Sequence, residues 1–213
     1  MTEIEDVALR CRCGTVRGVA RAVSPRTVNH CFCYCDDCQA FAHFLGRADD
    51  LLDAYGGTEV VQMSQASFAL TAGVESLAAM RLTEKGLMRW YASCCNTPIG
   101  NTLPTPAIPF IGLIRAFIDA PQAALGPIRG RAFAQNAKGG RAAVPQDGSS
   151  DFAMLVRMLP KLLGWRLRGD HKRSPLFDAA NRPLVEPRVL DAAEREELRR
   201  ARAAWRNEPP AAG

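Results

Sequence analysis

The sequence lacks the features that mark membrane and secreted proteins. Its longest nearly apolar run, AIPFIGLI at residues 107–114, is far shorter than the roughly 20 residues that cross a bilayer. The acidic N-terminus, MTEIEDVALR, has no positively charged start followed by an apolar stretch, so no secretory signal is expected. These absences predict a cytoplasmic protein without a membrane partner.

Motifs of several enzyme classes are also absent. The sequence has no H-E-x-x-H of zinc proteases, no H-x-E with P-C-x-x-C of nucleobase deaminases, and no glycine-rich phosphate-binding loop. The arginines between residues 195 and 206 are interleaved with glutamates, which is typical of a solvated helix face. A nucleic-acid partner is therefore not expected.

Eight cysteines, all before residue 96, are the main chemical signal. They occur in C-R-C-G at residues 11–14, C-F-C-Y-C-D-D-C at 31–38 and C-C at 94–95. Cytosolic reductants keep thiols reduced, so clustered cysteines in a cytoplasmic protein favour metal binding over disulfides. Thiolates suit zinc, and the common ferredoxin spacings are absent, so zinc is expected rather than an iron–sulfur cluster. We expect two zinc ions per chain, with one as the minimum.

Short segments between glycine-containing breaks predict β structure in the first part of the chain. Together they predict an antiparallel meander, and residues 38–46 predict a short helix. Three prolines between residues 104 and 109 mark a boundary. We predict a cysteine-rich zinc-binding β domain at residues 1–103 and a basic loop-and-helix region at 104–213 that can pack on it. The predicted strands of the meander are residues 58–64, 66–73, 77–83 and 87–93.

Two helices are predicted in the second part. The first begins at Ser150 and is disturbed at Pro160. The second is better marked, because Asp191 followed by Glu194 fits the carboxylate version of a capping box, and this helix should run to about Trp205.

The order of the cysteine motifs resembles the glutathione-dependent formaldehyde-activating enzyme family, which includes the centromere protein V type members. The shared pattern is C-x-C-G, then C-x-C-x-x-C, then R-x-[FY] with a cysteine followed by T-P, over about residues 9–103. The resemblance implies a zinc-bearing β-tent. The predicted fold class is therefore α+β: a mainly antiparallel β zinc-binding β-tent domain followed by a mixed, largely helical C-terminal extension.

The resemblance also implies two zinc sites with different roles. One is structural, and its matching ligands here are Cys11, Cys13 and Cys95. The other holds zinc with an open position for a substrate thiol, and its matching catalytic ligands are Cys33, Cys35 and Cys38. The implied activity is that of a carbon–sulfur lyase, with glutathione or another small thiol and its aldehyde adduct as partners.

Three positions depart from the family pattern. Ala92 stands where the fourth structural ligand is expected, Asn96 replaces a glycine, and Gln39 replaces an arginine that follows the triplet in many members. Cys94 can replace the missing ligand if the chain bends after the strand, because adjacent residues of an extended strand point to opposite faces. Otherwise Cys94 is a small buried apolar residue.

Cys31 leaves the type of the second site open. It lies two residues before Cys33 and would share its face, so it can complete a closed four-thiolate site, whereas three thiolates leave a position for substrate. A closed site favours the alternative function, a non-catalytic structural zinc module that binds a protein or nucleic-acid partner. A third hypothesis is a redox switch, at Cys94 and Cys95 or at Cys31 and Cys33.

Overall fold

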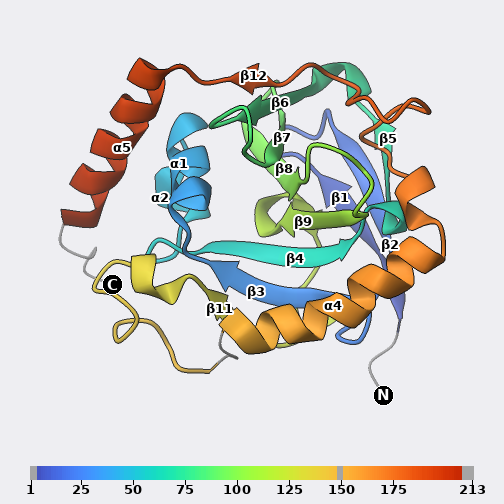
Figure 1. Ribbon diagram of the computed structural model, residues 1–213, viewed down its shortest axis with the longest axis horizontal. Coiled ribbons are helices and arrows are strands. Elements are labelled where there is room, and N and C mark those ends of the chain that lie inside the picture. Colours follow the sequence, from blue (N-terminus) through green and yellow to red (C-terminus); the bar gives the residue numbers. More distant parts are fainter. Residues whose placement is uncertain (1–3, 148–150, 208–213) are drawn as a thin grey trace.

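The computed structural model describes residues 4–147 and 151–207. In this part of the chain two β-sheets form the body of the molecule, and helices lie around them (Figure 1). The smaller sheet has four strands in the order β10-β1-β2-β5, all paired antiparallel. Its strands are β1 (Glu5–Arg10), β2 (Arg17–Val23), β5 (Phe68–Ala72) and β10 (Ile118–Asp119).

The larger sheet has eight strands in the order β11-β3-β4-β9-β8-β7-β6-β12. Its six inner strands pair antiparallel, and the two edge pairs, β11 with β3 and β12 with β6, are parallel. The strands are β3 (Asn29–Cys33), β4 (Thr58–Ser64), β6 (Leu77–Arg81), β7 (Met88–Ala92), β8 (Thr97–Thr102), β9 (Phe110–Ile114), β11 (Arg131–Ala132) and β12 (Arg188–Val189).

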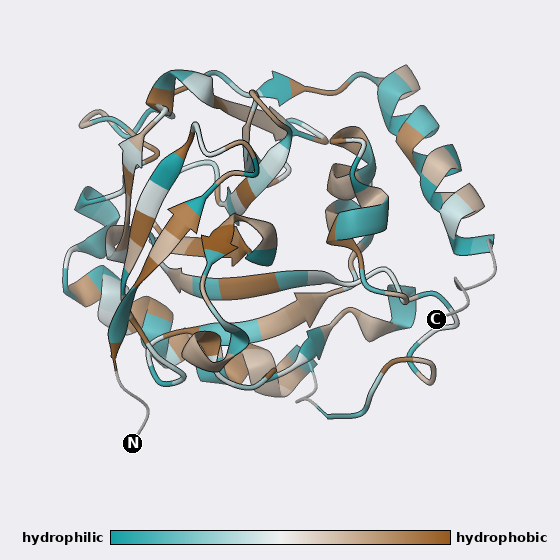
Figure 2. Ribbon diagram, turned by 180° about the vertical axis from the view of Figure 1, so that it is seen from behind, coloured by the Kyte–Doolittle hydropathy of each residue, from teal (hydrophilic) through white to brown (hydrophobic). Residues whose placement is uncertain are grey.

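One continuous core of buried apolar side chains joins the two sheets, and hydrophobic colour is concentrated on the central strands (Figure 2). Leu9 of β1 and Leu113 of β9 both belong to this core. Trp90 of β7 is fully buried, and its indole nitrogen donates to the Thr102 hydroxyl at 2.9 Å. The buried indole therefore keeps its hydrogen bond inside an apolar surrounding, as a stable core requires.

The helices lie at the periphery of the sheets. α5 lies beside α1 at one side of the molecule, and α4 runs along the outer edge below β3 (Figure 1). No helix in the described ranges is long and apolar enough to cross a membrane. The helices are α1 (Asp36–Phe44), α2 (Ala48–Leu51), α3 (Gln122–Leu125), α4 (Asp151–Leu167) and α5 (Ala192–Asn207).

The predicted cap of α5 is present. The Asp191 carboxylate accepts the backbone N–H of Glu194 at 2.9 Å, and the Glu194 carboxylate accepts the N–H of Asp191 at 3.0 Å. The predicted start of α4 at Ser150 lies outside the described residues, and α4 continues through Pro160 to Leu167.

The predicted fold class is wrong. The described chain is mostly β, with two sheets of twelve strands in all and five helices, so it is not a β-tent followed by a largely helical extension. The second part supplies β9, β10, β11 and β12, and its helices α3, α4 and α5 make up only part of it. Three of these strands have two residues each, and such pairs carry no periodicity that a sequence pattern can reveal.

The predicted meander is also corrected. Strands do form near each predicted segment, but β5 joins the smaller sheet and β4 pairs with β3 and β9. Of the four predicted strands, only the last two, β6 and β7, are antiparallel neighbours, and the series continues through β8 to β9. Glycine-containing breaks indicate where a strand ends, but they do not determine which strand it then pairs with.

Candidate metal centres

The first cysteine group consists of Cys11, Cys13, Cys94 and Cys95. Their four Sγ atoms lie within 4.8 Å of one another. The Sγ of Cys13 is 3.5 Å from that of Cys11 and 3.3 Å from that of Cys94, and the sulfurs of Cys94 and Cys95 are 3.9 Å apart. A tetrahedral zinc with Zn–S bonds of about 2.3 Å has sulfurs about 3.8 Å apart. The first group therefore fits a tetrahedral four-thiolate ion.

Two turns bring these cysteines together. Cys11 follows β1, and the backbone of Gly14 has a φ of +79°, which closes the turn back to β2. β7 ends at Ala92, and residues 93–96 form a turn in which Asn96 has a φ of +52°. The bend that lets Cys94 and Cys95 face one ion is thus present. Cys94 is exposed, so its alternative interpretation as a buried apolar residue is wrong.

The second cysteine group consists of Cys33, Cys35 and Cys38, whose Sγ atoms lie within 4.8 Å of one another. Cys33 ends β3, and the Sγ atoms of Cys33 and Cys35 are 3.3 Å apart. Cys35 caps α1, because its sulfur accepts the backbone N–H of Cys38 at 3.4 Å. The N-terminus of a helix favours negative charge, and the hydrogen bond with Cys33 lowers the pKa of Cys35, but the hydrogen bond with Cys38 and burial outweigh it and raise that pKa to about 12.

Each group contains a thiol that ionises readily. Hydrogen bonds with Thr15 lower the pKa of Cys13 to about 6. Hydrogen bonds from Cys33 and Cys35, together with the nearby Arg89 guanidinium, hold the pKa of Cys38 well below its usual range. A soft or borderline cation can bind such a thiolate and then displace the protons of the neighbouring thiols, so that all the sulfurs become ligands.

Arg89 of β7 is buried beside the second group. Its Nη1 donates to the Asn101 side-chain oxygen at 3.2 Å and lies 3.9 Å from the Cys38 sulfur. Its Nη2 is 3.4 Å from the Asp37 carboxylate, but it makes no hydrogen bond to a described residue. A buried guanidinium with an unused donor is costly unless a further acceptor, such as an anionic ligand, is bound.

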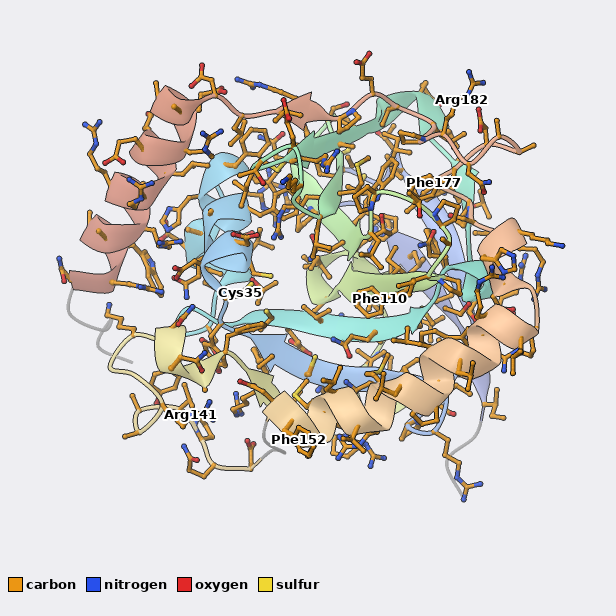
Figure 3. All side chains as sticks on the ribbon, viewed as in Figure 1. Cys35, Phe110, Arg141, Phe152, Phe177 and Arg182 are labelled. Atoms are coloured by element: carbon orange, nitrogen blue, oxygen red, sulfur yellow. The ribbon has the colours of Figure 1, made fainter. Side chains whose placement is uncertain are left out.

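A cavity of about 470 Å³ adjoins the second group. All three cysteines and Arg89 line it, with Asn101 and the apolar Phe110. Figure 3 shows Cys35 below α1 and Phe110 on the central sheet. A concave site of this size, with a few polar groups among apolar side chains, is typical of small-molecule binding.

The comparison with protein families matches residues 3–187 to a family of unknown function, DUF6151. The chain belongs to the DUF6151 family. The match spans both cysteine groups and both predicted parts of the chain, and α5 lies beyond it. The predicted resemblance to the formaldehyde-activating enzymes is a separate hypothesis that this match does not test.

The other comparisons add little to the DUF6151 assignment. No curated protein matches the chain. A crystal structure of a Rhodobacter sphaeroides protein aligns with 57% of this chain and 96% of its own, at 15% identity and a TM-score of 0.37. That similarity is too low to support an inference about fold or function.

Cys31 does not join the second group in this DUF6151 member. Its side chain is buried beside Val60, Ile114 and Met154 and lines the same cavity, but its sulfur is outside the cluster of three. Burial, and then the negative charge of Cys38, raise the pKa of Cys31 to about 12. Cys31 is therefore a protonated thiol at neutral pH in this arrangement.

The sequence analysis did not identify Arg89 as a site residue. Arg89 entered only as the arginine of the R-x-[FY] pattern. Neither the composition nor the residue spacing of the sequence indicates that this side chain is buried. Gln39 was considered for ligand recognition, but it is buried and bonded internally. Its amide donates to the Tyr34 carbonyl at 2.9 Å and accepts from Arg206 of α5 at 3.1 Å. The DUF6151 cavity thus takes its positive charge from β7.

Proposed function

We propose that this protein binds two zinc ions and uses the second cysteine group to bind a small anionic thiol. The two groups can hold metal ions, and zinc is the metal that an all-thiolate, tetrahedral donor set favours. The first group has four sulfurs and suits a structural ion. The second has three, and it is the candidate for substrate binding.

The observation that carries this proposal is the position of the second group at the cavity. A zinc ion held by Cys33, Cys35 and Cys38 would supply a fourth coordination position for a substrate sulfur. The Nη2 of Arg89, which is 3.4 Å from the Asp37 carboxylate and makes no hydrogen bond to a described residue, can donate to a carboxylate on the same molecule. Together these groups select a thiol that carries negative charge, such as glutathione.

The resemblance to the formaldehyde-activating enzymes extends this proposal to a reaction. In the forward direction the substrate sulfur forms a bond to the carbonyl carbon of formaldehyde, the π electron pair moves to the oxygen, and that oxygen takes a proton. The lyase direction reverses each step. The cavity would contribute by holding the thiol and the aldehyde next to each other.

Metal content and cobalt substitution test the proposal. We expect about two zinc ions per chain in protein purified without added metal, measured by elemental mass spectrometry. Cobalt(II) placed at the second group should change its visible absorption when glutathione is added, because a new sulfur ligand alters the ligand field. Methionine in place of glutathione, with a thioether instead of a thiol, is the matched control.

Three results would contradict the proposal. The first is purified protein that contains no metal and has freely reactive thiols, which would contradict the zinc sites. The second is protein that binds metal at both groups but whose cobalt(II) spectrum does not change when glutathione is added, which would contradict thiol binding. The third is loss of one zinc in Cys31→Ser, because it would make Cys31 a ligand and close the second group. That third outcome would support the alternative, a structural zinc module.

A further inference from the structure

The outer face of α4 is apolar and exposed. Its six exposed apolar side chains are between 50% and 79% accessible. The inner face is also apolar, with Met154, Met158 and Trp165 buried against the body. A large exposed apolar surface on a helix normally marks a site that a partner or a membrane covers. We call the exposed set the α4 ridge: Phe152, Leu155, Val156, Leu159, Leu163 and Leu167.

The ridge follows one side of the helix. Each member lies three or four positions from at least one other member, so they share one face along α4. α4 runs along the outer edge of the molecule, and Phe152 is at one end of it (Figures 1 and 3). The ridge is therefore accessible to a partner that presents a flat surface.

A basic cavity lies on one flank of the ridge. It has a volume of about 420 Å³, and no acidic side chain is among its lining residues. Within the described residues Arg21 and Arg26 form no ion pair, and Arg168 is paired with Asp170 at 3.2 Å. Lys161 of α4 donates to the Arg26 and Thr27 carbonyls. The four cations of this cavity are Arg21, Arg26, Lys161 and Arg168.

Further positive charge surrounds the same flank. Arg129 and Arg157 lower the pKa of Lys161 after the larger effect of its burial, so all three cations lie close together. α4 itself carries Arg157, Lys161 and Arg166 but only one acidic residue, Asp151. The surface thus combines an exposed apolar ridge with a dense group of cations, of which Arg21 and Arg26 form no ion pair with a described residue.

We propose that the α4 ridge and the basic cavity bind the surface of an anionic phospholipid bilayer. Helices with one apolar face and neighbouring Lys and Arg lie in the interface, where apolar side chains enter the acyl boundary and cations contact phosphate groups. This mode needs no spanning segment, so it is compatible with the absence of a long apolar run. The expectation of no membrane partner considered only such runs.

A second copy of the chain is a less suitable occupant. Two α4 ridges packed around a two-fold axis would bring the same cations of both copies into one interface, and like charges repel there. Anionic headgroups neutralise them instead. Charge complementarity therefore selects the bilayer.

Vesicle flotation with the full chain tests the proposal. We expect the protein to float with vesicles of equal parts phosphatidylcholine and phosphatidylglycerol, to stay in solution with phosphatidylcholine alone, and to be released by high salt. Leu159→Glu combined with Leu163→Glu should abolish flotation. Arg21→Gln combined with Arg26→Gln should weaken binding by about tenfold or more, because each cation near an anionic surface contributes about a factor of five.

Val74→Glu is the control, since Val74 is an exposed apolar residue in the turn between β5 and β6 and not on α4. It should float like the unchanged protein, and circular dichroism should show that all variants are folded. Three outcomes overturn the proposal: no flotation with either vesicle, equal flotation with both, or a dimer in solution that Leu159→Glu with Leu163→Glu converts to a monomer. The last would assign the ridge to a second copy.

Discussion

Arg89 determines the charge balance of the second cysteine group. Burial alone would lower its pKa, but the thiolates of Cys38 and Cys35 and the Asp37 carboxylate raise the pKa above its usual range. The guanidinium is therefore fixed in its charged form beside the sulfurs. It offsets the negative charge of the buried Cys38 thiolate, and it would do the same for all three sulfurs when a metal ion is bound.

Arg89→Met should separate charge recognition from thiol binding. We expect affinity for glutathione to fall about tenfold or more, because a charged hydrogen bond is lost, while affinity for uncharged 2-mercaptoethanol changes little. The cobalt(II) spectrum at the second group reports both titrations. Arg81→Met, on the neighbouring strand β6 and outside the cavity, is the control. An equal loss for both thiols would contradict a role in charge recognition.

Cys94→Ala should test whether the first group holds an ion. We expect zinc content to fall from two ions to one and the free energy of unfolding to fall by several kcal/mol, since a structural zinc contributes on the order of 10 kcal/mol to folding. Ser93→Ala changes the neighbouring exposed residue and should keep both ions. An unchanged zinc content in Cys94→Ala would show that residue 94 is not a ligand.

The cysteines were accessible to sequence reasoning because their spacing is short and their chemistry is specific. Cys33, Cys35 and Cys38 are predicted as one group and lie together in the structure. Arg89 was not accessible, because β7 is covered on both faces and both Arg89 and Trp90 are buried. The alternation of buried and exposed residues that identifies a half-exposed strand fails there.

At the scale of elements, the cap of α5 holds a helix that connects distant parts of the site. Arg206 of α5 donates to the Asp36 carboxylate at 3.0 Å and to the Asn136 carbonyl, and both of these residues line the cavity. Trp205 packs edge-on against His43 of α1. α5 therefore fixes the rim of the cavity from outside.

Asp191→Ala should loosen this helix. Loss of the cap costs about 1 kcal/mol and leaves the first N–H groups of α5 without a partner, so hydrogen exchange should quicken along α5. Glu197→Ala, an exposed change on the same helix, is the control and should leave exchange nearly unchanged. Equal exchange in both variants would mean that packing alone holds α5.

Sequence patterns predicted long, well-marked elements and missed short ones. β4 and α5 are marked by β-branched residues and by a cap, which act locally and can be read directly. β10, β11 and β12 have two residues each and exist because a neighbouring strand offers free hydrogen-bonding groups. These strands depend on tertiary contacts, so no local sequence pattern predicts them.

At the scale of the whole molecule, β9 connects the two predicted parts of the chain. It lies between β4 and β8 in the middle of the larger sheet, although it follows the predicted boundary at residue 103. Ile111 and Leu113 of β9 are fully buried in the shared core. The strand order could not be predicted, because the pairing of β9 with β4 depends on packing across the whole sheet.

A chain that ends at residue 103 should therefore not fold. Without β9, two strands lose their hydrogen-bonding partner and the core loses its central apolar side chains. Circular dichroism should show no cooperative thermal unfolding for this fragment. A chain that ends at residue 190 loses α5 but keeps both sheets, and it should unfold cooperatively. A cooperatively folded fragment of residues 1–103 would establish the predicted domain instead.

The two cysteine groups differ in how much of the chain must be synthesised before each exists. The second group spans residues 33–38 and is complete almost as soon as it leaves the ribosome. The first joins Cys11 to Cys94, 83 positions later, and needs both turns in place. Metal loading of the two proposed sites would thereby be ordered in time: a nascent, unfolded chain could already capture an ion at the second group, whereas the first group would acquire one only after the sheets have assembled.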